Sequence, residues 1–374
     1  MRRAFKFRLY PTREQRVRIE QQFYQCRRLY NAMLEQRRTA WRSHRISLGL
    51  FEQSRQIVDV VHALPEYAAM YSQVLRHTAK PLDLAFQAFF RRIRAGEKPG
   101  FPRFRGRHRW DSLTYPQAQN GSVRIHDDRV SLSKLVENVR FVQHRTLEGT
   151  VKTATISREA DRWFLILTCD HVPPRLIAGS SEIGLDVGLT HLATTDAGFV
   201  LENPRFEQHA LERLRNAHRR VSRGTKGSHR RRKTLLLLQK AYLKIRDQRR
   251  YHYHKLARTL VVQNRRIAVE AIHPSQMLNA SPSSNRNIHD AAWTLFLSIL
   301  RRKAEEAGAT VVDVNPAYTT QTCSQCGARA PKPLWQRVHQ CVCGLVLDRD
   351  VNAAKNILNQ ARLEPSWTTP MGVG

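Results

Sequence analysis

Four of the six cysteines in this chain lie within one short segment, and their spacing constrains the fold more than any other feature. Cys323 and Cys326 form a C-x-x-C pair, and fourteen residues later Cys341 and Cys343 form a C-x-C pair. A hairpin that joins two such pairs supplies the four thiolates that a tetrahedral zinc ion prefers. Free buried thiols or a redox pair are the alternatives, but a redox C-x-x-C does not need a second pair. We therefore predict a structural zinc site, with no coordination position left for a substrate.

The charge of the chain limits its partners. The 374 residues include 63 Lys and Arg against 31 Asp and Glu, a formal net charge of +32. This excess indicates a polyanionic partner, and nucleic acid fits best. An acidic membrane is the alternative, but no segment approaches the roughly 20 apolar residues that a spanning helix needs. The basic N-terminus lacks the apolar core of a signal peptide. Because the cysteine pattern also favours a metal over disulfides, we predict a cytoplasmic protein without a membrane partner.

The first part of the chain is predicted to be a β-module that is interrupted by helices. Apolar and basic residues alternate in residues 1–10, as in a strand with one buried face. Thr12 and Gln15 form a capping box at the start of a helix, and residues 71–94 have a second helical pattern. Residues 112–170 are again typical of strands. If the first strand joins this later sheet, the helical segment is an insertion.

A basic loop is predicted between the helices and the later strands. The segment GEKPGFPRFRGRHRW excludes helix through Pro and Gly, and it alternates aromatic residues with Arg103, Arg105 and Arg107. Arginine binds phosphate and aromatic rings stack on bases, so the pattern suits a loop that faces nucleic acid. A solvated basic linker explains the same composition equally well.

The second part of the chain has the pattern of an α/β domain. EIGLDVGLTHLATTDAG predicts a strand and a hairpin, RRIAVEAI and TVVDV predict buried strands, and IHDAAWTLFLSILRRKAEEAG predicts one amphipathic helix that ends at Gly308. Residues 213–250 contain fifteen Lys or Arg and a single acid, Asp247. No packed core could bury that charge. We expect long basic helices with one face toward phosphate.

Three acids stand at the ends of these elements. Asp186 and Glu270 end short apolar strands, and Asp350 precedes the helix VNAAKNILNQARL. Each has an ordinary structural explanation: Asp350 as a helix N-cap, Asp186 as a turn former and Glu270 as a surface residue. In so basic a chain, however, strand-end acids of an α/β domain are suited to hold divalent cations against a phosphodiester.

Motifs along nearly the whole chain resemble those of the TnpB family, the transposon-encoded RNA-guided nucleases related to type V CRISPR effectors. The matching stretches are FRLYPT, CRRLYNAMLEQ, FPRFRGR, GLDVGLTHLATTDAG, VNPAYTTQTCSQCG and CGLVLDRDVNAAKNI. The resemblance implies a multidomain α/β plus β protein. Its parts are a wedge β-barrel (1–10 and 112–178), a helical recognition domain that interrupts it (11–111), a RuvC-like nuclease domain of RNase H fold (179–318 and 348–362, with basic helices in 205–262), an inserted zinc ribbon (319–347) and a tail (363–374).

The resemblance also implies roles for single residues. Asp186, Glu270 and Asp350 match the catalytic acids of the first, second and third RuvC motifs, which hold catalytic Mg²⁺ or, as an alternative, Mn²⁺. The family pattern places the third acid in R-D-x-N-A-A, so Asp348 fits less well. The short second cysteine pair and the HPSQM stretch after Glu270 depart from the family, but neither removes a catalytic group.

A further implied role concerns target recognition. By family analogy, a short duplex motif beside the target meets the helical and wedge domains. Gln73 and Arg76 on one predicted helix are the candidates for that contact, and an ordinary solvated helix face is the alternative.

The expected function is that of an RNA-guided, metal-dependent DNA endonuclease of a transposable element. Its partners would be a guide RNA from the mobile element and double-stranded target DNA, whereas the sequence does not define an oligomeric state. In this hypothesis the zinc ribbon precedes the final helix, so the chain leaves the zinc site and delivers Asp350 to the other two acids. A non-cleaving regulator of transposition is an alternative against which the three acids argue. A structure-selective resolvase is another, but it would not need the modules before Asp186.

Overall fold

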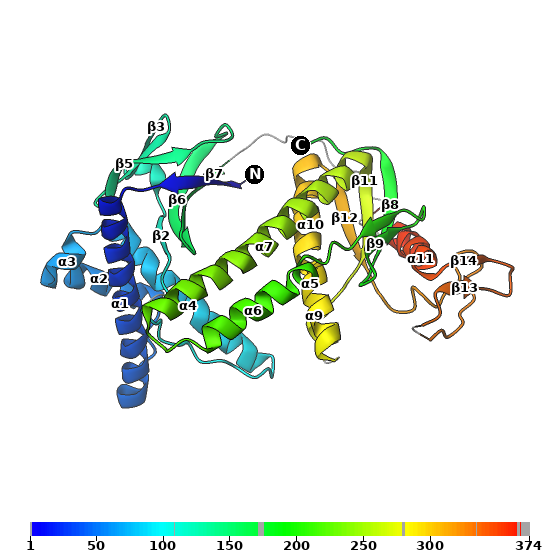
Figure 1. Ribbon diagram of the computed structural model, residues 1–374, viewed down its shortest axis with the longest axis horizontal. Coiled ribbons are helices and arrows are strands. Elements are labelled where there is room, and N and C mark those ends of the chain that lie inside the picture. Colours follow the sequence, from blue (N-terminus) through cyan, green and yellow to red (C-terminus); the bar gives the residue numbers. More distant parts are fainter. Residues whose placement is uncertain are drawn as a thin grey trace. The chain divides into compact units, whose positions relative to one another are not determined.

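The computed structural model describes residues 2–107, 109–170, 176–278, 281–333, 335–364 and 367. The chain forms two compact units, residues 1–173 and residues 174–374, and each unit has its own sheet and hydrophobic core (Figure 1). None of the described helices is long and apolar enough to cross a membrane.

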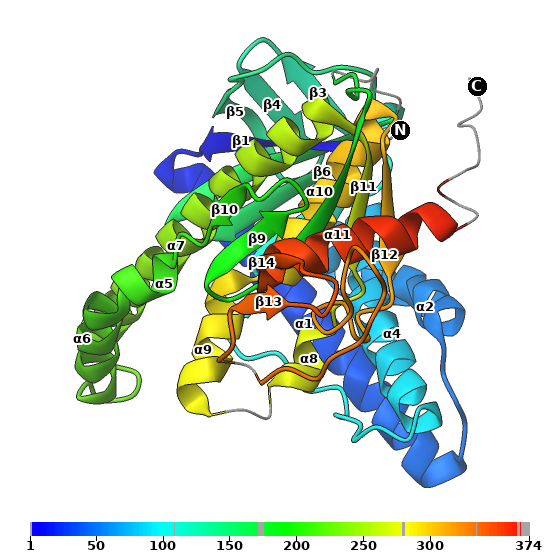
Figure 2. The same ribbon diagram turned by 90° about the vertical axis from the view of Figure 1, so that its right-hand side faces the viewer.

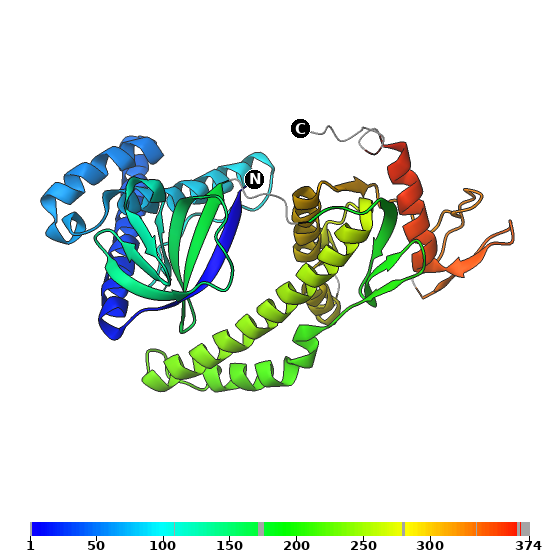
Figure 3. The same cartoon turned by 90° about the horizontal axis from the view of Figure 1, so that it is seen from above.

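The first unit contains a seven-stranded antiparallel sheet that curls into a barrel-like form (Figure 3). The strand order is β2-β6-β7-β1-β5-β4-β3. Their bounds are β1 (Arg3–Tyr10), β2 (Ser112–Tyr115), β3 (Val123–His126), β4 (Arg129–Leu132), β5 (Val136–Val142), β6 (Thr150–Glu159) and β7 (Arg162–Asp170). Phe5, Phe7 and Leu9 of β1 are buried, as the alternating pattern predicts. β1 pairs with β5 and β7, so the predicted joining of the first strand to the later sheet is confirmed.

Helices occupy the chain between β1 and β2. They are α1 (Arg13–His44), α2 (Leu50–Ala63), α3 (Pro65–Ala68) and α4 (Ser72–Arg94). The predicted capping box is confirmed, because Thr12 and Gln15 each accept a hydrogen bond from the backbone of the other. The buried Arg37 of α1 donates to Gln53 of α2 and forms an ion pair with Asp83 of α4, and these contacts join the three helices.

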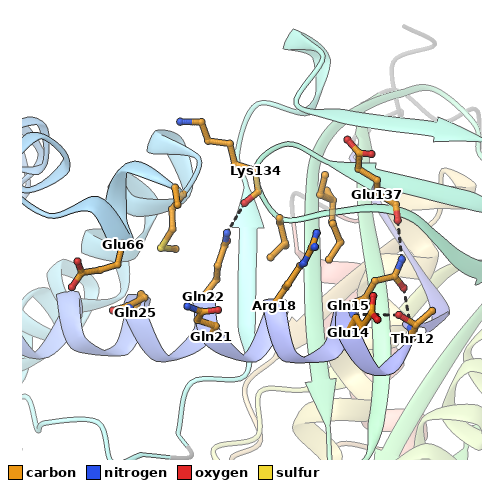
Figure 4. A pocket seen from close by; sticks show the side chains of 15 residues that line it. Thr12, Glu14, Gln15, Arg18, Gln21, Gln22, Gln25, Glu66, Lys134 and Glu137 are labelled. Atoms are coloured by element: carbon orange, nitrogen blue, oxygen red, sulfur yellow. Dashed lines mark hydrogen bonds between the residues drawn. The ribbon is translucent and has the colours of Figure 1, made fainter.

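Glutamine side chains fasten α1 to the sheet of the first unit (Figure 4). Gln22 Nε2 donates to the backbone oxygen of Lys134 at 2.6 Å, and Gln15 Nε2 donates to that of Glu137 at 2.8 Å. These residues line a polar hollow of about 620 Å³. The start of α1 is therefore held against the segment that leads from β4 into β5.

The second unit has a five-stranded sheet in the order β10-β9-β8-β11-β12. Its strands are β8 (Ser181–Val187), β9 (His191–Thr195), β10 (Val200–Glu202), β11 (Asn264–Glu270) and β12 (Thr310–Val314). β8 pairs antiparallel with β9 and parallel with β11, and β11 pairs parallel with β12. The predicted strands and hairpin are confirmed, and β8 lies at the centre of the sheet.

Helices cover both faces of this second sheet, so the unit has three layers (Figures 1 and 2). α7 (His229–Gln263) and α10 (Trp293–Ala307) pack on one face, and α11 (Arg349–Leu363) packs on the other. Ile267 and Ala268 are neighbours in β11 and face opposite layers, which places one in each core. The short helices are α5 (Phe206–His209), α6 (Leu211–Ser222), α8 (Pro274–Met277) and α9 (Pro282–Ala291).

The predicted basic helices are present, whereas one predicted helix is divided. α6 and α7 pack through a small apolar cluster that includes Leu214 and Leu238. The single helix predicted up to Gly308 is wrong, because Ala292 adopts a left-handed backbone (φ 46°) between α9 and α10. The break is stabilised by long-range contacts: Tyr253 Oη donates to the oxygen of Ala291, and Trp293 Nε1 donates to that of Gly188.

Trp367, in the C-terminal segment, contacts the second sheet. The indole of Trp367 is buried against β11, β12 and α11, and its Nε1 donates to Glu182 at 3.1 Å. Glu182 also pairs with Arg266 and Arg362. The rest of the predicted tail beyond residue 364 lies outside the described residues.

Replacement of Gly184 by Ala should separate α11 from β8. A Cβ at this position would lie 2.2 Å from the backbone oxygen of Ala354 and 2.9 Å from Cβ of Leu358. We expect the free energy of unfolding to fall by about 2 kcal/mol or more and the amides of α11 to exchange faster. Thermal unfolding and hydrogen exchange of the full chain measure both effects.

Gly106→Ala is the matched control, since no atom lies within 4 Å of its added Cβ. Equal stability of the two variants would contradict the tight packing of α11 on β8.

Candidate active site and metal centre

The four predicted zinc cysteines converge in the second unit. All four Sγ atoms lie within 4.8 Å of one another, with Cys323 to Cys343 at 3.7 Å and Cys326 to Cys341 at 3.4 Å. Four Zn–S bonds of about 2.3 Å in a tetrahedron place the sulfur atoms about 3.8 Å apart. The donor set therefore fits a zinc ion in type, number and spacing, even with the short second pair.

Local backbone structure positions the four cysteines. The hairpin of β13 (Val338–Gln340) and β14 (Val346–Asp348) presents the second pair. Gly327 and Gly344 follow the two pairs with φ of 77° and 88°, a conformation that glycine adopts without strain. Burial raises the pKa of the Cys323 thiol, but the backbone amides of Cys326 and Gln325 together with the thiols of Cys341 and Cys326 outweigh it and bring the pKa to about 6. Cys323 is thus predisposed to bind a cation as the thiolate.

Two of the three predicted acids end neighbouring parallel strands. The register pairs Leu185 of β8 with Val269 of β11, so Asp186 and Glu270 occupy the next position on each strand. Neighbouring strands lie about 4.8 Å apart, which brings the two carboxyl groups to the same edge of the sheet. Asp186 is only 9% exposed and Glu270 is half-buried. Asp186 is therefore not a turn former, and Glu270 is not a fully exposed surface residue.

The third acid lies in the first turn of α11. Asp348 is the N-cap, because its side chain accepts hydrogen bonds from the backbone amides of Asp350 and Val351. Asp350 is therefore free of the capping role and half-buried, and its Oδ2 lies 3.9 Å from Arg337 Nη1. Helix α11 packs across β8 (Figure 2). The negative charge of Asp350 is thereby close enough to raise the pKa of Asp186.

The acids influence one another electrostatically. Burial, followed by the negative charges of Glu270 and Asp350, raises the pKa of Asp186 to about 8. Burial also raises the pKa of Glu270 and of Asp350. An ionised trio at this edge is unfavourable without positive charge, as expected for carboxylates that bind cations.

The carboxylates are less tightly gathered than the thiolates. Among the described residues, the cysteines are the one group of three or more potential ligands whose atoms all lie within 4.8 Å of one another. The protein alone therefore places the three acids in one neighbourhood without closing them into a cage. Mg²⁺ sites commonly use few carboxylates and complete their shell with water and substrate oxygens.

Thr319 is a residue that the sequence analysis missed. Its hydroxyl donates to Glu270 Oε1 at 2.5 Å, and its side chain is only 2% exposed. This bond opposes the burial effect on the pKa of Glu270 and limits the orientations of the carboxylate. The TTQTC stretch contained Thr319, but no local pattern predicts a contact 49 residues away in the chain.

Two buried asparagines of α11 hold the segment that contains Thr319 and Cys323. Asn356 Nδ2 donates to the backbone oxygens of Thr319 and Thr322 at 2.8 and 2.7 Å. Asn352 Nδ2 donates to Thr322, and its Oδ1 accepts from the amide of Ser324. The helix that carries Asp350 is thus bonded to the backbone around the first cysteine pair. The sequence predicted the adjacency of the two sites but not these side chains.

The five predicted nucleic-acid contacts all lie in the first unit. Gln73 and Arg76 belong to α4, where Arg76 is exposed and Gln73 is half-buried. Arg103 and Arg107 are exposed. Arg105 differs, because its guanidinium lies over the rings of Tyr30 and Trp110 at 4.8 and 4.9 Å. Arg105 therefore packs the loop against α1.

Comparison with protein families identifies three matching regions. Residues 150–281 match the model described as "Probable transposase" (OrfB_IS605), and residues 293–357 match "Cas12f1-like, TNB domain". Residues 1–45 match "Helix-turn-helix domain" of the same OrfB group, although here they fold as β1 and α1. The class indicated is a transposon-encoded protein with a Cas12f1-like C-terminal part.

Whole-chain relatives identify the family. A Streptomyces pristinaespiralis protein named "Putative RNA-guided DNA endonuclease" is 32% identical over 96% of this chain and 89% of its own length. An Escherichia coli K12 protein of the same name, InsQ, is 29% identical over 95% of this chain and 91% of its own. This chain belongs to the TnpB family of OrfB_IS605-type proteins.

One solved structure has the same overall fold. The protein in "Cryo-EM structure of the Cas12f1-sgRNA-target DNA complex" matches 98% of this chain and 99% of its own, with a TM-score of 0.59. Its sequence is only 13% identical, so the likeness concerns the fold.

Loss of the Asn356 amide should loosen the segment between Thr319 and Cys323. Asn356→Ala leaves the backbone oxygen of Thr319 without its amide donor and removes one of the two amide donors to the oxygen of Thr322. This loss should lower stability by about 1–3 kcal/mol. We expect faster hydrogen exchange in residues 319–324, measured by mass spectrometry of the full chain. Asn359→Ala, an exposed position on the same helix, is the control. If the two variants exchange alike, the asparagine contacts do not hold this segment.

Proposed function

We propose that this protein is an RNA-guided DNA endonuclease of a transposable element, with a RuvC-like site that hydrolyses phosphodiester bonds. The observation that carries the proposal is the arrangement of Asp186, Glu270 and Asp350 at one edge of the second sheet. Asp186 ends the central strand of a three-layer α/β unit, which supports a nuclease domain of RNase H fold. The names of the whole-chain relatives support the same activity.

The acids would bind divalent ions, Mg²⁺ or alternatively Mn²⁺. Such ions supply activation of a water molecule and stabilisation of the leaving oxygen. Asp186 and Glu270 would hold them from the sheet, and Asp350 would hold them from α11. Substrate oxygens would complete the site, which agrees with carboxylates that the protein alone leaves apart.

The cysteine group would hold a structural zinc ion. Its four donors fit tetrahedral coordination, and the ribbon around it lies between β12 and α11. Asn352 and Asn356 connect the backbone near Cys323 to α11. Zinc would therefore act on cleavage through the position of Asp350 and Thr319.

Nucleic-acid recognition would be divided between base pairing and the protein. A guide RNA would read the target sequence, and the basic surface, including α6 and α7, would hold the backbone of the heteroduplex. Residues 1–10 and 112–178 would form the wedge barrel and residues 11–111 the recognition domain. Gln73 and Arg76 would contact a short motif in the target duplex.

Removal of the Asp186 charge should abolish cleavage without harming the fold. Because burial and the other acids raise its pKa, the ionised form destabilises the folded state, so Asp186→Asn should keep or increase thermal stability in metal-free buffer. Mg²⁺-dependent cleavage of guide-matched DNA should fall at least about 100-fold, with guide RNA affinity unchanged.

Asp313→Asn is the control, because Asp313 is an exposed acid in the same sheet. This variant should cleave DNA as the wild type does. Retained nicking by Asp186→Asn would show that the site is misassigned. If the wild-type protein with copurified RNA binds matching DNA but never cuts it, a non-cleaving regulator of transposition is the better function.

The hydroxyl of Thr319 should position Glu270 for metal binding. Thr319→Val keeps the shape but removes the donor, so we expect cleavage to fall about tenfold and the half-saturating Mg²⁺ concentration to rise. Thr319→Ser keeps the hydroxyl and should restore both values. Equal metal dependence of the Val and Ser variants would rule out this role.

The zinc site should support cleavage from a distance. In Cys326→Ser, we expect the zinc content measured by elemental analysis to fall and cleavage to decrease, because the backbone that supports Thr319 loosens. Gln325→Ser is the control, because it changes a neighbouring exposed residue and keeps all four cysteine ligands. Full cleavage by a zinc-free variant would reject the coupling.

A further inference from the structure

An aromatic pocket lies in the first unit, which contains none of the residues assigned to cleavage. It has a volume of about 570 Å³ and is lined by aromatic side chains from the end of α1, from α4 and from the following loop: Trp41, Phe86, Phe89, Phe90 and Phe101. We call these five residues the aromatic pocket. All five belong to the same compact unit.

Packing between the rings shapes the pocket. Phe101 folds back from the loop and contacts Phe86 and Phe89 edge-on, with ring centroids 5.6 and 5.4 Å apart. Phe89 and Phe90 also meet edge-on, at 5.2 Å. The loop segment GFPRF is therefore anchored on α4 by aromatic contacts, which give the pocket a defined wall.

Much of this aromatic surface is left in water. Trp41 is 52% exposed, Phe90 is 50% exposed and Phe101 is 47% exposed. Apolar surface gathered in one hollow in this way is a sign of a binding site. Flat rings with exposed faces suit flat partners in particular.

The rim of the pocket is positively charged. Arg38 and Arg42 line it, and the guanidinium of Arg45 lies over the Trp41 ring at 5.6 Å. Arg37 at the inner wall is neutralised by Asp83. Arg42 is exposed and makes no hydrogen bond or ion pair within the described chain, so it can take an anionic group.

We propose that the aromatic pocket binds an unpaired nucleotide, with its base stacked on the exposed rings and its phosphate on Arg42. Unpaired nucleotides combine a flat apolar face with a negative charge, which matches rings beside arginines. A second copy of this chain fits poorly, because two arginine rims would repel each other. The proposal rests on nucleic-acid binding in the proposed function and adds a site for single-stranded segments, of RNA or of DNA.

Photo-crosslinking of the full-length protein tests this site. One arm uses a short RNA with 4-thiouridine and the other a short single-stranded DNA with 4-thiothymidine, each at high salt to suppress pure phosphate binding. Mass spectrometry then maps the crosslinked peptides. We expect crosslinks at Trp41, Phe90 or Phe101. A signal from RNA alone assigns the pocket to the guide, and a signal from DNA alone assigns it to the target.

Affinity measurements complete the test by separating stacking from general apolar contact. Trp41→Leu combined with Phe101→Leu keeps apolar volume but removes the ring faces, and the affinity for the same oligonucleotide should fall about tenfold. Phe51→Leu, an 81% exposed ring outside the pocket, should bind like the wild type. Thermal unfolding of each variant excludes a loss of fold.

Defined results would overturn the proposal. Crosslinks that map only to other surfaces, or wild-type affinity in the double Leu variant, would remove the site. A dimer of the wild type that the double variant abolishes would identify the pocket as a self-association surface instead. Asp186→Asn should crosslink normally, so a failure of the proposed nuclease site is distinguished from a failure of this pocket.

Discussion

The close contact between α11 and β8 is the constraint on which the second unit depends. The backbone of the helix approaches Gly184 so closely that no side chain fits between them. Asp350 lies in the first turn of this helix, and Asn352 and Asn356 lie two and six residues further along it. A single packing arrangement therefore places an acid beside the sheet and holds the segment that leads to the zinc cysteines.

Charge explains why this geometry suggests phosphodiester chemistry. Three acids gathered near the end of a buried strand repel one another, and burial strengthens the effect at Asp186. Cations relieve the repulsion, and in a protein of net charge +32 the expected partner brings phosphates to the same place. Divalent ions between carboxylates and phosphate satisfy both groups. The cysteine group differs, because its four thiolates supply all the ligands of a tetrahedral ion without any substrate atom.

Local patterns predicted much of the fold, whereas long-range contacts determined the rest. Alternation in residues 1–10 and the spacing of the cysteines are periodic or short-range signals, and the first strand and the cluster of four cysteines are both present. The break at Ala292 depends on Tyr253 and Trp293, whose partners lie far away in the chain. Local sequence patterns likewise do not predict the hydrogen bond from Thr319 to Glu270, because it exists only after the strands and the ribbon segment have come together.

The central claim is that the three acids form a cation site in the folded protein. Anomalous diffraction from crystals of the full-length protein grown with Mn²⁺ and guide RNA measures this directly. The account predicts an anomalous peak coordinated by Asp186, Glu270 and Asp350. Carboxylates that remain more than about 10 Å apart, without density between them at saturating Mn²⁺, would contradict it.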